Sequence, residues 1–188
     1  MCIRDSSDYS LGSPGAVSLR ASGATEFADK KRIHKGKFPH QSVTAAYLYE
    51  FASDRDNIIR TAHFMVGNNC VPFDLALLCA TRIEWRTENG ILEAYADIPA
   101  VAEGAEDSER PYYTRTPFAA KENVPLWGLA PIFREGWSYM QTEHYLEVPE
   151  EIRNLGQHVG GRSAASFDEA GVDEFARAFG YRIIDLTS

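Results

Sequence analysis

The chain lacks any long hydrophobic run. The stretch from Val71 to Ala80, one of its longest apolar segments, is interrupted by Pro72 and Asp74, and a membrane-spanning helix needs roughly 20 apolar residues. The N-terminus also lacks the basic and apolar segments of a secretory signal. We therefore predict that the chain has no membrane span and is cytoplasmic.

Cysteine is scarce, with three residues among 188, at Cys2, Cys70 and Cys79. They are too few and too unevenly spaced for a disulfide framework, so we expect free thiols. With His63, the second and third cysteines offer three ligands whose spacing matches no common zinc pattern. The sequence predicts no metal site.

The familiar phosphate-binding motifs are also missing. The chain contains neither Gly-x-Gly-x-x-Gly nor Gly-Lys-Ser/Thr, so we predict no nucleotide or other cofactor. The turn Gly160-Gly161-Arg162-Ser163 has the residues to hold an anion through backbone amides. Ordinary turn chemistry explains the same residues.

The composition of the chain indicates a folded domain with an excess of acidic residues. The composition is 44% hydrophobic, 12% aromatic and 24% charged, which supports a hydrophobic core. The net charge is −8, but residues 1–40 hold seven Lys and Arg against four Asp and Glu, leaving twelve against twenty-three in residues 41–188. The mean field of such a body repels nucleic acid, although a local basic patch can still bind it.

Residues 1–38 read as a leader rather than as part of the fold. Residues 7–26 are rich in Ser, Gly and Ala without helical or strand periodicity, so we predict a linker there. Residues 1–6 resemble translated adapter sequence of a metagenomic assembly. We therefore expect a fragment whose natural start is missing, with a single α+β domain over residues 39–188.

Helical spacing begins after the leader. A first helix is predicted from Ser42 through Phe51, and a second from Asp54 or Asp56 to Gly67. Together they predict an antiparallel helical hairpin. A third helix is predicted to start at Pro72.

A β-hairpin is predicted next. The step Asn89-Gly90 separates two alternating segments, which predicts strands at about 82–87 and 91–98. Further along we expect a short strand at 112–116, one or two short helices within 126–140, and helices at 149–157 and from about 168 to 180. The predicted fold is α+β, with a small antiparallel sheet around the hairpin and C-terminal helices ending in a strand at 181–186.

One candidate chemistry is that of a cysteine nucleophile. A thiolate beside a histidine base suits hydrolysis or group transfer, and Cys70 with His144 or His158 is the pair that we consider. Cys79 lies on the apolar face of a predicted helix, where we expect an inert thiol.

Two surfaces are candidates for binding. The basic run contains Lys30, Lys31, Arg32, Lys35 and Lys37, which suits nucleic-acid contact by a flexible arm or, equally simply, a solubilising hinge. The segment 112–145 is rich in aromatic residues that suit a partner surface or, alternatively, a core. The binding candidates there are Tyr112, Tyr113, Arg115, Trp127, Arg134 and Trp137.

These patterns favour a non-catalytic interaction or regulatory module of a larger intracellular protein. Its partner would be another protein or an upstream domain of the same polypeptide. The alternatives are a thiol-dependent hydrolase or transferase that uses Cys70, and nucleic-acid contact through residues 30–37.

Overall fold

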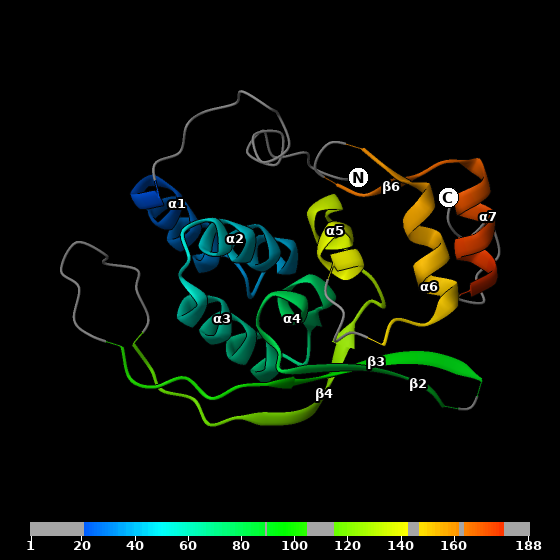
Figure 1. The fold of residues 1–188 in the computed structure, drawn as a ribbon. Coiled ribbons are helices and arrows are strands. Elements are labelled where there is room, and N and C mark those ends of the chain that lie inside the picture. Colours follow the sequence, from blue (N-terminus) through cyan, green and yellow to red (C-terminus); the bar gives the residue numbers. More distant parts are fainter. Residues whose placement is uncertain (1–20, 89, 105–114, 143–146, 162–163, 179–188) are drawn as a thin grey trace. The chain divides into compact units, whose positions relative to one another are not determined.

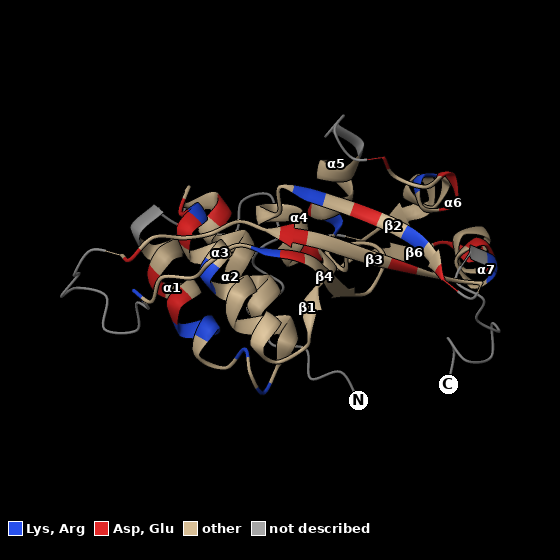
Figure 2. Cartoon of the chain, turned by 90° about the horizontal axis from the view of Figure 1, so that it is seen from below, with Lys and Arg blue, Asp and Glu red and all other residues tan. Residues whose placement is uncertain are grey.

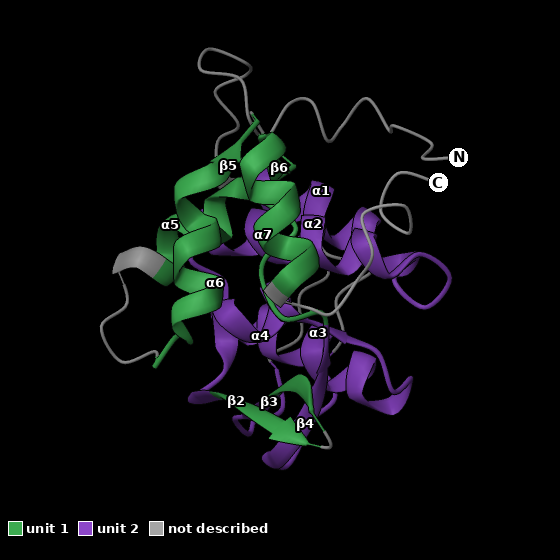
Figure 3. Cartoon of the chain, turned by 90° about the vertical axis from the view of Figure 1, so that its right-hand side faces the viewer, with its two compact units in different colours: residues 1–17, 84–94, 128–188 green, residues 18–83, 95–127 purple. Residues whose placement is uncertain are grey.

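The computed structural model describes residues 21–88, 90–104, 115–142, 147–161 and 164–178 (Figure 1). The chain divides into two compact units (Figure 3). Residues 18–83 and 95–127 make up unit 2, and residues 1–17, 84–94 and 128–188 make up unit 1. The prediction of one domain over residues 39–188 stays a prediction.

Four helices form most of unit 2. They are α1 (Ala21–Ile33), α2 (Pro39–Phe51), α3 (Arg55–Gly67) and α4 (Phe73–Cys79). Pro39 occupies the first turn of α2, where its missing N–H costs nothing, and the carboxylate of Asp54 accepts the Asn57 N–H at the start of α3. The predicted helical hairpin and third helix are confirmed.

Helix α2 is the centre of unit 2. Every residue from Gln41 to Tyr49 is buried, and α2 contacts α1, α3 and α4. A helix covered on all sides carries small or apolar residues all round rather than on one stripe. This explains the alanines and tyrosines of α2, which share the helix with few charged residues.

Helix α1 corrects the predicted leader. Residues 21–33 are helical rather than a linker, and Ala24 and Ala28 are fully buried where α1 packs on α2. Alanines four residues apart let two helix backbones approach closely, but they give no strong apolar periodicity in the sequence. Residues 1–20 of the predicted leader lie outside the described residues.

The four-stranded sheet has the order β1-β4-β3-β2. Its strands are β1 (Val71–Pro72), β2 (Arg82–Glu88), β3 (Ile91–Ile98) and β4 (Lys121–Trp127). The predicted hairpin is confirmed as β2 and β3. Because β1 runs parallel to β4 while β3 runs antiparallel to it, the sheet is mixed and not purely antiparallel as predicted.

Strand β4 was not predicted from the sequence. The apolar run after Pro125 was expected to be helical, yet Pro125 lies in β4 opposite Tyr95. A proline is uncommon inside a sheet because it cannot donate to a neighbour. Here the strand on the other side of β4 is only two residues long and pairs with Leu126 and Trp127, beyond the proline.

The described C-terminal part of unit 1 is mainly helical. It contains α5 (Arg134–Thr142), α6 (Glu150–Leu155), the 3₁₀ helix η1 (Gly156–His158), the antiparallel pair β5 (Val159–Gly160) and β6 (Ser166–Phe167), and α7 (Glu169–Ala178). The predicted helices near 149–157 and 168–180 are confirmed. Residues 112–114 and 181–186, where two strands were predicted, lie outside the described residues, and Arg115 and Thr116 are not in a strand. In neither unit is a described helix both long and apolar enough to cross a membrane.

Candidate functional site

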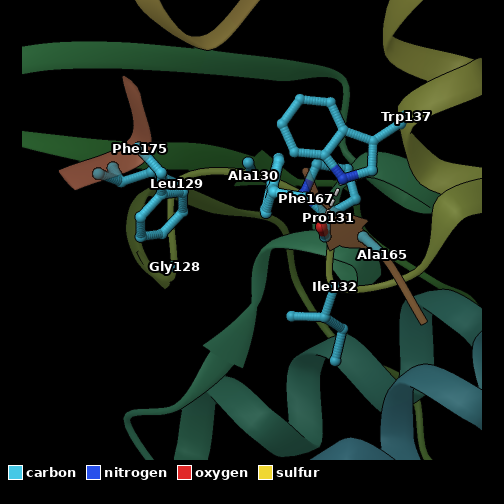
Figure 4. A pocket seen from close by; sticks show the side chains of 9 residues that line it. All are labelled: Gly128, Leu129, Ala130, Pro131, Ile132, Trp137, Ala165, Phe167 and Phe175. Carbon is cyan, nitrogen blue, oxygen red and sulfur yellow. Dashed lines mark hydrogen bonds between the residues drawn. The ribbon is translucent and has the colours of Figure 1, made fainter. Parts of the chain in front are cut away.

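Unit 1 contains an apolar cavity of about 330 Å³ (Figure 4). A loop after β4, one helical tryptophan and residues around β6 and α7 line it, and the cavity is open to solvent on one side. The lining residues are Gly128, Leu129, Ala130, Pro131, Ile132, Trp137, Ala165, Phe167 and Phe175. All nine belong to the same compact unit.

Hydrogen bonds fix the loop 128–132 in place. The Leu129 carbonyl accepts the Trp85 indole N–H at 3.1 Å, and the Ile132 carbonyl accepts the Ala165 N–H at 2.8 Å. Gly128 begins the loop with a φ of +88°, a conformation that favours glycine. Since these carbonyl groups are already paired, the loop presents mainly apolar atoms to the cavity.

Three aromatic residues build the wall of the cavity. Trp137 is only 3% exposed, and its indole N–H donates to the Pro131 carbonyl at 2.8 Å. The ring of Phe167 meets Trp137 edge-on with centroids 5.8 Å apart, and Phe175 lies 5.6 Å from Phe167. The first pair is edge-to-face, a favourable arrangement at this distance, and the second is tilted by 44°.

A charged cluster anchors α7, which carries Phe175. Asp168 caps this helix by accepting the Gly171 N–H at 2.8 Å, and its carboxylate lies 3.0 Å from Nδ1 of His158. On the other side of the imidazole, Nε2 lies 3.3 Å from Glu174. The Gly171 N–H, followed by the His158 hydrogen bond, lowers the pKa of Asp168 below its ordinary value.

Glycine is required at position 171 for this arrangement. A Cβ atom there would lie 2.5 Å from Cβ of His158, which is closer than real side chains approach. Removing the side chain lets η1 lie directly against the first turn of α7. The position of the histidine therefore depends on this glycine.

The cavity is suited to binding an apolar group. The nine described lining residues include no nucleophilic or acid–base side chain. Within the part of the chain that the structure describes, no group of three or more His, Cys, Asp or Glu residues is placed to hold a metal ion. Shape and apolar contact are what this site offers a ligand.

The predicted binding candidates of the segment 112–145 differ in their surroundings. Trp137 is buried in the cavity wall, whereas Trp127 is 56% exposed on β4. Arg134 donates to the Gly161 carbonyl at 2.9 Å, and Arg115 is exposed. Tyr112 and Tyr113 lie outside the described residues; of the other four, Arg115 and Trp127 belong to unit 2 and Arg134 and Trp137 to unit 1.

The thiols have different surroundings. Burial raises the pKa of Cys79 to about 12, as expected for an inert thiol. Cys70 is half-buried, and no hydrogen bond joins it to a histidine among the described residues. His158 belongs to unit 1 while Cys70 belongs to unit 2, and His144 lies outside the described residues.

The basic run is part of the folded structure and not a free arm. Lys30 pairs with Glu26 at 2.7 Å, and Lys31 lies over the Phe27 ring. Arg32 is only 2% exposed and donates to Asn57 on α3 at 2.7 Å. Lys35 and Lys37 follow α1, in the turn before α2.

The sequence did not identify most of the cavity residues as parts of a functional site. A helix was expected over the segment that carries Phe175, but Leu129, Ile132 and Phe167 were not singled out. One local signal pointed toward Phe167, because it directly precedes the cap residue Asp168, and a residue at this position often packs against the helix that follows. Comparison of the chain with models of protein families, with curated proteins and with solved structures gave no match.

Proposed function

We propose that this chain is a non-catalytic protein-interaction module, and that the cavity of unit 1 receives an apolar side chain of a partner protein. The observation that carries the proposal is the cavity itself: a preformed, aromatic-walled space of about 330 Å³. Buried aromatic pockets of this kind dominate the binding energy of protein interfaces.

The lining favours a protein side chain over a small polar ligand. Sites for small molecules combine apolar walls with a few converging polar groups that orient the ligand. Here the carbonyls of Leu129, Pro131 and Ile132 are already paired with Trp85, Trp137 and Ala165. A Leu, Ile, Met or Phe side chain needs no polar partner at its tip.

The size of the cavity agrees with this occupant. Ligand pockets range over about 300–1,000 Å³, and this one is at the small end. Ile132 is 42% exposed at the cavity, where it can add apolar contact with the residues that flank an inserted side chain. We infer a short, linear partner segment with one or two apolar anchors.

The test is selection of peptides from a random displayed library on the full chain. We expect enrichment of peptides that share a large apolar residue at one position. The variant Ala165→Leu fills the cavity and should lose these peptides, whereas Ala170→Leu adds the same group at an exposed position of α7 outside the lining and should retain them.

Two results would count against this function. One is enrichment of peptides that bind wild type and Ala165→Leu equally well, because the cavity would then not be the site. The other is enrichment of peptides that do not share an apolar residue at any one position. Circular dichroism of both variants shows whether each has kept the fold, and Ala130→Leu provides a second way to fill the cavity.

A further inference from the structure

Unit 2 carries a surface whose charge is opposite to that of the chain as a whole. The eight residues from Ile33 to His40 contain Lys35 and Lys37 but no Asp or Glu, in a chain of net charge −8. Figure 2 shows Lys and Arg in blue at the end of α1 and in the turn toward α2. The fold therefore concentrates positive charge at one place.

Exposed aromatic rings lie within this basic surface. Phe38 in the turn is 42% exposed and Phe64 on α3 is 41% exposed. The ammonium group of Lys35 lies 3.9 Å from the centroid of the Phe64 ring, and that of Lys37 lies 5.4 Å from the Phe38 ring. We call the surface formed by His34, Lys35, Lys37, Phe38, His40 and Phe64 the basic turn.

The lysines of the basic turn have no carboxylate partner among the described residues. Lys35 donates to the Arg32 carbonyl at 3.1 Å, and Lys37 lies against Phe38. Burial, followed by the nearby Arg32, lowers the pKa of Lys35 to about 8. An anion bound beside Lys35 would offset the second of these two causes, the repulsion from Arg32.

We propose that the basic turn binds single-stranded nucleic acid. Lys35 and Lys37 contact two phosphates, and bases stack on Phe38 and Phe64. Proteins that bind single strands combine these two elements, a basic track for the backbone and aromatic rings for the bases. The inference concerns unit 2 and is independent of the cavity in unit 1.

Two observations favour a single strand over a membrane surface. Each ring is more than half covered by protein, so little of it is available for insertion into hydrocarbon, and its exposed part is what a base can contact. The ring of His40 lies 5.9 Å from that of Phe38 and is tilted by 53° to it, so it adds a second aromatic group beside Phe38. A duplex hides the faces of its bases, so it should bind less well than a single strand.

The test measures fluorescence anisotropy of a labelled oligo-dT of about 12 nucleotides with the full chain. Two lysine–phosphate contacts predict a slope of about −1.4 in log affinity against log salt. The double variant Lys35→Gln/Lys37→Gln should abolish most of this slope. Lys30→Gln removes a lysine that pairs with Glu26 on α1 and should leave the slope nearly unchanged.

The rings are tested with Phe38→Ala and Phe64→Ala, each of which should weaken binding about tenfold or more. Phe51→Ala removes an exposed phenylalanine outside the basic turn and should retain the affinity. Phe64→Leu keeps the apolar contact with Lys35 but has no planar ring, so it should also weaken binding. Because this variant retains a large apolar side chain, its loss of binding would not come from a folding defect.

The proposal is overturned if the oligonucleotide does not bind at low salt, or if the ring variants bind as tightly as wild type. Equal affinity for a duplex of the same length would also overturn it, because stacking would then contribute nothing. Binding of vesicles containing phosphatidylserine in place of the oligonucleotide would identify a membrane surface instead.

Discussion

The imidazole Nδ1 of His158 lies 3.0 Å from Oδ1 of Asp168, and the same oxygen accepts the Gly171 N–H at 2.8 Å. One carboxylate thus caps α7 and holds the histidine that precedes β5. Glu174, on the next turn of α7, faces the second imidazole nitrogen at 3.3 Å. Only a protonated imidazole can donate to both carboxylates, so the cluster joins η1 to α7 as an ion pair when His158 is charged.

Two substitutions at position 168 distinguish the contribution of the helix cap to stability from that of the carboxylate charge. Asparagine retains an acceptor for the Gly171 N–H but has no charge for His158, and alanine lacks both. We expect melting temperatures at neutral pH to fall in the order wild type, Asp168→Asn, Asp168→Ala, as measured by circular dichroism. Equal melting temperatures for the asparagine and alanine variants would show that the cap contributes nothing.

The pH dependence of the same variants follows from the lowered pKa of Asp168. A carboxyl whose folded pKa is depressed contributes stability above its ordinary pKa of 3.8, and this stability is lost as the pH falls through the folded pKa. The stability difference between wild type and Asp168→Asn should therefore close on acidification below 3.8. A difference that persists after Asp168 is protonated would contradict this assignment.

Two neighbouring cations of α1 should differ greatly in their effect on stability. Arg32 is 2% exposed, donates to Asn57 and lies 3.8 Å from Asp29, whereas Lys30 makes an exposed pair with Glu26. Arg32→Met should cost about 3–5 kcal/mol because it leaves buried polar groups without their cation. Lys30→Met should cost about 0–1 kcal/mol.

Urea denaturation of the two variants measures this difference. A similarly small loss for both would mean that α1 behaves as the linker first predicted and contributes little to the folded unit. Measurement of Arg32→Lys adds a further comparison, because lysine keeps the charge but lacks the planar guanidinium that reaches Asn57 and Asp29 together.

Local signals were sufficient for much of the fold. Asn89-Gly90 predicted the hairpin of β2 and β3, and Asp54 predicted the start of α3, because turn and cap chemistry depend on a few adjacent residues. Helix α1 was missed because its contacts use Ala24 and Ala28, which resemble linker composition. Strand β4 was missed because its neighbours in the sheet are residues 71–72 and 95–98, which are far away in the sequence.

The candidate site was harder to predict for a related reason. Trp137 was recognised as an unusual residue, but its environment consists of the loop 128–132 and of Phe167 and Phe175. No periodicity relates positions 137, 167 and 175, so the sequence alone did not show that they share a cavity. The sequence also gave no sign that Arg32 turns inward while Lys35 and Lys37 remain in the basic turn.

Thiol reactivity should distinguish the two described cysteines. Raising the pKa of Cys79 from 9.0 to about 12 lowers its thiolate fraction about a thousandfold, and its burial hinders reagents further. We expect iodoacetamide to leave Cys79 unmodified in the native protein while it labels half-buried Cys70 faster. Mass spectrometry resolves the sites, and labelling in denaturant is the control. Rapid native labelling of Cys79 would contradict the burial described here.

His63 should make the stability of unit 2 depend on pH. Its Nε2 lies 2.8 Å from the Pro99 carbonyl, and its ring stacks on Phe118 with centroids 4.9 Å apart. Burial is the main cause that lowers the pKa of His63 below its ordinary value of 6.5; the hydrogen bond to Pro99 acts in the opposite direction, and the positive charge of Lys121 lowers the pKa further. The neutral imidazole, which can donate from Nε2 to Pro99, is therefore the form that the fold prefers.

For a histidine with a depressed pKa, the unfolded chain takes up the proton first as the pH falls. The contribution of His63 to the free energy of unfolding is fully present above pH 6.5 and is lost as the pH falls through the pKa of His63 in the folded protein. We expect the free energy of unfolding of wild type to fall through this window more steeply than that of His63→Gln, which cannot titrate there. NMR of the His63 ring should give a midpoint below 6.5. A midpoint above that value, or equal slopes for the two proteins, would show that burial does not disfavour the charged ring.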